Sequence, residues 1–200
     1  MDCCSEKLIR KYRAIQFAGL SVLQSGIIVA SFYPYYLNFK NYKMKPNIGL
    51  SEKNLKSITS ILSSVLADAI LLYIKTRKFH WNVSGNSFME LHKLFEKQYK
   101  ILEEAIDEIA ERINKLGTKT PGTMQEFLQM TSLKESPGKY PSQKEMLNEL
   151  LKDHEAIIIQ LRKHIEDCDE KYGDIGTSDF LTDLIKEHET IAWTLRRYLQ

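Results

Sequence analysis

The chain has 200 residues, of which 43% are hydrophobic and 27% charged, and its formal net charge is +2. This composition is typical of a globular chain with one well-buried domain. Residues 1–43 carry a net charge of +4 and residues 44–200 a net charge of −2, so the larger part has no built-in attraction to nucleic acid. Cys3, Cys4 and Cys168 do not make a disulfide framework, which fits free thiols in a reducing compartment.

The first 43 residues form a basic and apolar leader. A basic run, KLIRKYR, precedes an uncharged stretch from Ala14 to Phe39, which is a pattern seen in signal peptides and membrane anchors. The stretch nevertheless contains several Gln and Ser residues and no clean small-x-small cleavage site. A third interpretation, which we prefer slightly, is that translation starts at Met44 and that residues 44–200 are the whole domain.

The remaining sequence predicts four long amphipathic helices. Apolar residues at i, i+3, i+4 and i+7 predict one helix from Ser51 to about Lys78 and a second from a cap at Asn86 or Ser87 to Gly117. A linker follows, in which TMQEFLQM predicts a short helix. Two more helices are expected at 142–172 and from Ser178 onward. The fold class is therefore all-α: a ferritin-like four-helix bundle with a short extra helix in the long connection between helices 2 and 3.

Five residues of types that bind metals lie around the second helix: His80, His92, Glu96, Asp107 and Glu111. His92 and Glu96 are four residues apart, as are Asp107 and Glu111, and about 20° of rotation separates the two pairs, so they share one edge. Along the axis, however, Glu96 and Asp107 are about 16 Å apart, which is too far for one ion. A two-fold dimer with antiparallel second helices would close two equal sites for iron or zinc. Spacing alone still favours a solvated charged face.

The sequence resembles the Dps family, the mini-ferritins also called DNA-binding proteins from starved cells. The resemblance covers residues 44–200 and rests on KTRKFHWNVSGNSFMELHKLFEKQY, DEIAER and HETIAWTLRRYL. It implies a ferroxidase site made of His80, His92 and Glu96 from one subunit and Asp107 and Glu111 from its partner. The family usually has Asp at the third position, where this chain has Glu96, and the longer side chain can shift the second iron.

The resemblance also implies an assembly and an activity. It implies a homo-oligomer, a hollow dodecamer, that oxidises Fe(II) with hydrogen peroxide and stores Fe(III) inside. Trp81 stands where the family has an aromatic residue near the iron, although simple dimer packing explains it equally well. Three carboxylates fall near the family's acidic iron-entry pore, and their alternative role is in turns and caps: Asp169, Asp174 and Asp179.

Several alternatives remain open at this stage. The in-bundle site of classical ferritins needs Glu-x-x-His motifs, and this sequence has none, so His154, His164 and His188 are expected to be ordinary surface or edge residues. A cage that acts mainly by DNA binding or structurally is the competing function, but the arm after Met44 offers only Lys45, Lys53 and Lys56. The expected location is cytoplasmic, with nucleoid association possible and membrane contact only if the leader is an anchor.

Overall fold

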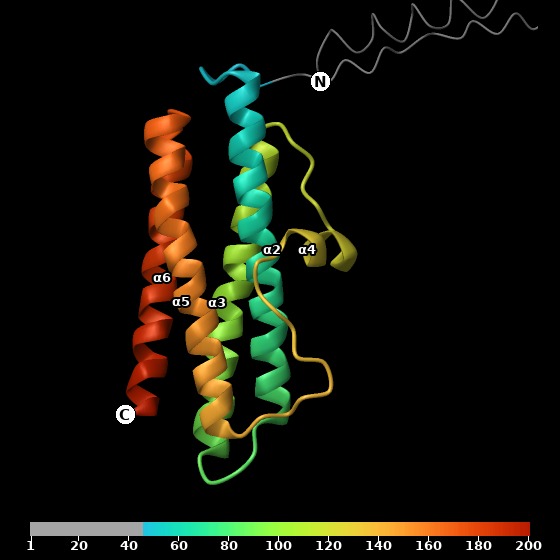
Figure 1. Cartoon of the computed structure of the whole chain (residues 1–200), viewed down its shortest axis with the longest axis vertical. Coiled ribbons are helices and arrows are strands. Elements are labelled where there is room, and N and C mark those ends of the chain that lie inside the picture. The colour runs from blue at the N-terminus through green and yellow to red at the C-terminus, as the bar shows by residue number, and fades with distance from the viewer. Residues whose placement is uncertain (1–45) are drawn as a thin grey trace, which may run out of the picture. The chain divides into compact units, whose positions relative to one another are not determined.

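The computed structural model describes residues 46–200, which fold as an all-helical bundle with no strand within that range. Four long helices run roughly parallel or antiparallel to one axis (Figure 1): α2 (Glu52–Asn82), α3 (Phe88–Lys115), α5 (Gln143–Glu166) and α6 (Ile175–Leu199). The short helix α4 (Met124–Met130) lies in the long α3–α5 connection and packs against α2. The predicted fold class is confirmed, whereas the leader predicted for 1–43 lies outside the described residues.

Local signals in the sequence set the helix ends. Ser51 caps α2, where its hydroxyl accepts a hydrogen bond from the Asn54 amide at 3.1 Å. Capping boxes, in which the cap hydroxyl and a Glu three residues later bond reciprocally to the backbone, start α4 at Thr123 and α5 at Ser142. Gly117 ends α3 with φ at +84°, and a Cβ there would lie 2.6 Å from Pro46 Cδ, so only glycine fits.

Three boundaries differ from the prediction. The first helix continues past Lys78 to Asn82, since no Gly or Pro interrupts it before Gly85, and His80 therefore lies on α2 itself. The third helix ends at Glu166 and continues as one π-helical turn, η1 (Asp167–Lys171). The fourth begins at Ile175 rather than Ser178, because the Asp174 carboxylate accepts a hydrogen bond from the Thr177 amide and caps the helix earlier.

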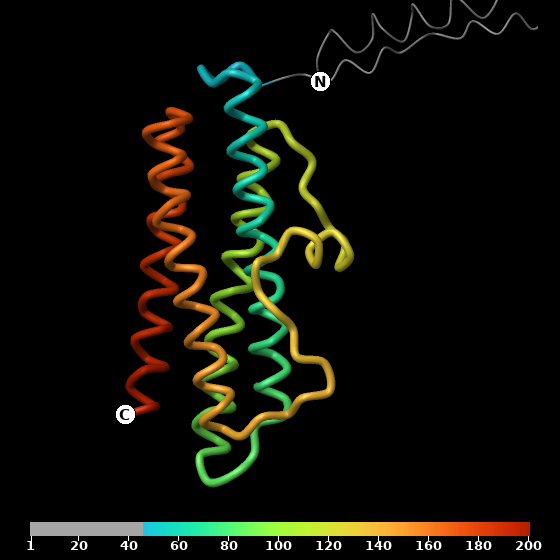
Figure 2. The backbone as a smooth tube through the Cα atoms, viewed as in Figure 1, coloured from blue at the N-terminus to red at the C-terminus, as the bar shows by residue number. Residues whose placement is uncertain are grey.

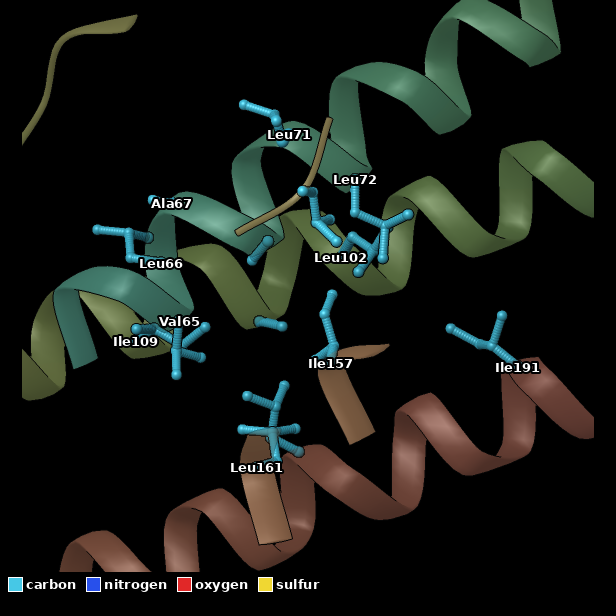
Figure 3. Packing of buried hydrophobic residues seen from close by; sticks show 14 of the residues in the cluster. Val65, Leu66, Ala67, Leu71, Leu72, Leu102, Ile109, Ile157, Leu161 and Ile191 are labelled. Atoms are coloured by element: carbon cyan, nitrogen blue, oxygen red, sulfur yellow. The ribbon is translucent and has the colours of Figure 1, made fainter. Parts of the chain in front are cut away.

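Two helical pairs enclose a continuous apolar core. The backbone trace shows α2 beside α3 and α5 beside α6 (Figure 2), and these are the most extensively contacting pairs. The close view in Figure 3 shows that all four long helices contribute side chains to the core: Val65, Leu66, Leu72, Leu102, Ile109, Ile157, Leu161 and Ile191. Burial of these side chains supplies the main driving force for folding and fixes the helix faces that remain outside.

The prediction for two of the histidines is wrong. His154 is fully buried and His188 is only 2% exposed, so neither is a surface or edge residue. Both lie on the apolar stripes of their helices, where a residue points into the core whatever its polarity. Their rings meet across the α5–α6 pair with the two Nδ1 atoms 2.9 Å apart. His164 is half-buried, as expected for an edge residue.

Polar contacts fix the α3–α5 connection to the bundle. The buried Asp68 carboxylate on α2 accepts hydrogen bonds from the Thr131 hydroxyl at 2.6 Å and the Ser132 amide at 2.7 Å. The Lys75 ammonium group donates to the Lys134 carbonyl at 2.9 Å and to the Asp153 carboxylate at 2.6 Å. These contacts place the connection across α2, so that α5 enters the bundle antiparallel to α2.

Candidate metal centre

The strongest geometric feature near the α2–α3 turn is a reciprocal pair of histidines. His80 Nδ1 lies 2.8 Å from the His92 carbonyl oxygen, and His92 Nδ1 lies 2.9 Å from the His80 carbonyl oxygen. A carbonyl oxygen can only accept, so in each neutral ring the proton sits on Nδ1 and is donated to the backbone. The lone pair of each ring is then on Nε2. This is the usual way in which a protein fixes the tautomer and orientation of a metal-binding imidazole.

The sequence holds these two rings in register. Gly85, with φ at +114°, turns the chain between α2 and α3, and the buried Phe79 and Phe95 rings pack across the two helices with centroids 6.5 Å apart. The His80 and His92 rings are stacked with centroids 3.8 Å apart. The twelve-residue spacing, which includes one tight turn, is therefore what places the two histidines side by side.

Glu96 lies one helical turn after His92 on α3. Its side chain is 38% exposed, and its carboxylate pairs with Lys100 Nζ at 2.6 Å. The hydrogen bond and the charge of Lys100 lower the pKa of Glu96, with smaller contributions from His80 and His92. The carboxylate is therefore ionised at neutral pH and is reachable from the outside, but its charge is balanced by the lysine.

Asp107 and Glu111 lie toward the other end of the same helix, and both are exposed. Glu111 pairs with Lys115 Nζ at 3.0 Å, which repeats the i, i+4 spacing of the Glu96–Lys100 pair fifteen residues further along α3. Within residues 46–200 no three His, Cys, Asp or Glu side chains come together to hold a metal ion. The five candidate ligands thus form two half-sites, one made by His80 of α2 with His92 and Glu96 of α3 and the other by Asp107 and Glu111 further along α3, and the chain by itself completes neither of them.

An aromatic and cationic cluster surrounds His80. The Tyr99 ring meets His80 edge to face with centroids 5.3 Å apart, and Tyr73 meets Tyr99 in the same manner at 6.1 Å. The Arg77 guanidinium lies 4.7 Å from the Tyr99 centroid and 5.5 Å from that of Trp81, whose side chain is 63% exposed. Arg77 and Tyr99 were not predicted as part of the site, although both lie on the same helix faces as His80 and His92.

The three carboxylates assigned to a pore differ in their surroundings. Asp174 is buried and accepts a hydrogen bond from Arg112 Nη2 at 3.1 Å. It also caps α6, which is the role that the sequence offered as an alternative to the pore. Asp169 and Asp179 are exposed near the same end of the bundle. For all three residues the pore role stays a prediction.

Comparisons with known proteins identify the relatives of this chain. The ferritin-like domain family matches residues 59–200. An uncharacterised low temperature-induced protein of Nostoc sp. is 45% identical over 135 residues, which cover 68% of this chain and 75% of that protein. DNA protection during starvation protein 2 of Bacillus anthracis is 37% identical over 127 residues, covering 63% of this chain and 85% of that protein.

Solved structures show the same relationship. DpsC from Streptomyces coelicolor superposes with a TM-score of 0.75 at 29% identity, covering 78% of this chain and 91% of that one. The Dps protein of Vibrio cholerae, described as a member of a broad superfamily of ferritin-like diiron-carboxylate proteins, gives a TM-score of 0.73 at 31% identity, covering 78% and 97%. On sequence, fold and relatives together, this chain belongs to the Dps family of ferritin-like proteins, a class of iron-storage and DNA-protection proteins.

Proposed function

We propose that this protein is a mini-ferritin that oxidises Fe(II) with hydrogen peroxide at sites between subunits and stores the Fe(III) product in a hollow dodecamer. The observation that carries this proposal is the reciprocal His80–His92 pair, because it leaves two Nε2 lone pairs on one face with a carboxylate, Glu96, one turn away. Imidazole nitrogen and carboxylate oxygen together suit iron.

The second half of each site comes from another subunit. Glu96 and Asp107 are eleven residues apart on the continuous helix α3, which corresponds to about 16 Å. When two α3 helices pack antiparallel about a two-fold axis, the His80, His92 and Glu96 end of one meets the Asp107 and Glu111 end of the other. Each dimer then contains two equivalent sites.

The residues of such a site suit the oxidation of its substrate, Fe(II). Anionic carboxylates stabilise Fe(III) more than Fe(II), so they favour the loss of one electron from each iron ion. Two Fe(II) ions give two electrons to one peroxide molecule, whose O–O bond breaks to form two hydroxides that take up protons as water. Because both electrons arrive together, no hydroxyl radical is released. This chemistry would protect DNA from oxidative damage.

Stopped-flow measurement of Fe(II) oxidation by peroxide tests the site assignment. His92→Ala and Asp107→Ala remove one ligand from each half-site, and each is expected to slow oxidation sharply. Glu108→Ala is the matched control, since Glu108 is an exposed acid beside Asp107 that no part of the proposal uses. Unchanged oxidation rates in both ligand variants would refute the assignment of His92 and Asp107 as iron ligands.

A cage that acts mainly on DNA is the alternative function. The name of the Bacillus anthracis relative refers to DNA protection during starvation. Within the described residues the start of α2 exposes only Lys53 and Lys56, which offers a small basic surface. A salt-sensitive gel shift that disappears on deletion of residues 1–43 would support DNA binding through the leader, and no shift at low salt would reject it. We place either function in the cytoplasm, with nucleoid association if DNA is bound.

A further inference from the structure

Three polar side chains lie in the apolar core of the bundle, away from the candidate metal centre. Gln98 on α3 is 3% exposed, His188 on α6 is 2% exposed and His154 on α5 is fully buried. Each occupies a core position of its helix, between buried apolar residues such as Phe95 and Leu102 on α3. The three polar groups therefore point toward the same interior and not toward solvent.

The three residues share one cross-section of the bundle. Tyr198 donates to Glu90 at 3.0 Å at one end of the α3–α6 pair, and Arg112 donates to Thr177 at 2.9 Å at the other. Counted from the first contact, Gln98 lies eight residues along α3 and His188 ten residues along α6, or about 12 and 15 Å. The two side chains are thus within about one helical turn of the same level. His154 joins this level through its 2.9 Å contact with His188.

The hydrogen-bonding capacity of this layer is only partly used within the described chain. In the His154–His188 contact one Nδ1 donates and the other accepts, so at least one ring is neutral. His154 Nε2 and both amide atoms of Gln98 are buried and have no hydrogen-bond partner among residues 46–200. Buried polar atoms in folded proteins nearly always have a partner, either protein or ordered water. Three such atoms in one cross-section therefore indicate a bound molecule that can both donate and accept.

We propose that Gln98, His154 and His188 form a polar layer in the bundle core that binds water, and that this water joins the Gln98 amide to the histidine pair. Water satisfies either tautomer of His154, because it can donate to Nε2 or accept from Nε2–H. The proposal goes beyond the iron chemistry and does not depend on it.

The charges around the layer argue against a metal ion as the occupant. The core of a four-helix bundle is a common place for metal sites, but those sites supply carboxylates. Gln98 and the two histidines supply none. Of the four carboxylates next to the histidines in the sequence, three are paired with other residues and the fourth, Glu187, is exposed. Asp153 pairs with Lys75, Glu155 with Arg196 and Glu189 with Arg162. A divalent ion in the layer would have no negative charge to balance it in an apolar core.

A crystal structure of the full-length protein tests the occupant directly. We expect a water peak within hydrogen-bond distance of both His154 Nε2 and the Gln98 amide, with no anomalous signal above the zinc or iron edges. An anomalous peak in the layer would overturn the proposal in favour of a metal site. A direct Gln98–His154 hydrogen bond, with no water between them, would overturn it as well.

Thermal unfolding of three variants gives a second test that does not require crystals. Gln98→Leu and His154→Leu each remove one partner of the shared water and leave the remaining partner buried without its full set of hydrogen bonds. Each variant should therefore lower the unfolding temperature by about 5 °C. The double variant removes both sides and should lose clearly less than the sum of the two shifts. Gln125→Leu, on the exposed surface of α4, is the matched control and should leave the unfolding temperature unchanged. Additive shifts in the double variant would contradict a shared water.

Discussion

A site divided between two chains predicts that two inactive variants restore activity to each other. His92→Ala destroys the histidine half-site, and Asp107→Ala destroys the acidic half-site. The two residues are fifteen positions apart on α3, about 22 Å along its axis, so neither change disturbs the other half-site locally. In a mixed dimer, one of the two sites combines the intact histidine half of one chain with the intact acidic half of the other.

The expected recovery follows from the symmetry. When the two variants are dissociated, mixed in equal amounts and reassembled at random, half of the dimers are mixed, and each mixed dimer has one intact site out of two. The initial rate of peroxide-driven Fe(II) oxidation should therefore reach about a quarter of the wild-type rate. Reassembly of His92→Ala with Glu108→Ala should instead give about half of the wild-type rate. The Glu108→Ala chains have both half-sites intact, so only the histidine half-sites of the His92→Ala chains are lost.

The assay compares reassembled mixtures with the same two proteins combined without dissociation. The undissociated mixture should retain the low rates of the single variants, since no new dimers form. A reassembled mixture of His92→Ala and Asp107→Ala with no gain over its parents, although mass spectrometry shows mixed dimers, would refute the two-chain site. Full activity in either single variant would refute the ligand assignment itself.

Three further predictions concern charge and burial. Burial lowers the pKa of His188 from 6.5 to about 4, so His188 binds a proton more readily in the unfolded chain than in the folded one. Stability should then fall by about 3 kcal/mol between pH 6.5 and pH 4, and a denaturant series on His188→Leu should show a smaller fall. Lys75→Met strands the carboxylates of Glu149 and Asp153, and calorimetry should show a loss of about 2 to 3 kcal/mol. Glu96→Asp should keep most of the peroxide-driven oxidation rate, whereas Glu96→Gln should lose it, because the negative charge is what the iron requires.

The sequence predicts the helices well because each of them carries a long apolar stripe with caps and glycines at its ends. It also predicts that one chain alone cannot close a site from both the His92–Glu96 and the Asp107–Glu111 pairs. That prediction needs only the helical rise, and Glu96 and Asp107 do lie on one unbroken helix. The stacked pair of His80 and His92 could not be predicted from the helical rise, because it depends on how α2 and α3 pack against each other.

The buried histidines show where reasoning from motifs fails. His154 and His188 are expected at the surface or an edge because neither belongs to a Glu-x-x-His motif, yet their positions coincide with the apolar stripes of α5 and α6. Position on the stripe decides burial, and the buried polar atoms then need a partner in a neighbouring helix or in bound water. Gln98 follows the same rule on α3. Asp174 is another buried polar residue, which caps α6 and pairs with Arg112, and its pore role stays a prediction.

The separation of the two polar regions has a consequence for the order of folding and iron uptake. The core layer is uncharged in its resting state, and the candidate ligands lie outside the core, with Glu96 and Glu111 each balanced by a lysine one turn later. The bundle can therefore fold without iron, in contrast to small domains whose metal site supplies the folding energy. Iron binding then has to displace Lys100 from Glu96, so iron uptake is a step that follows folding. Thermal unfolding of the isolated protein should accordingly change little on addition of a chelator, and a large loss of stability would show that metal is part of the folded subunit.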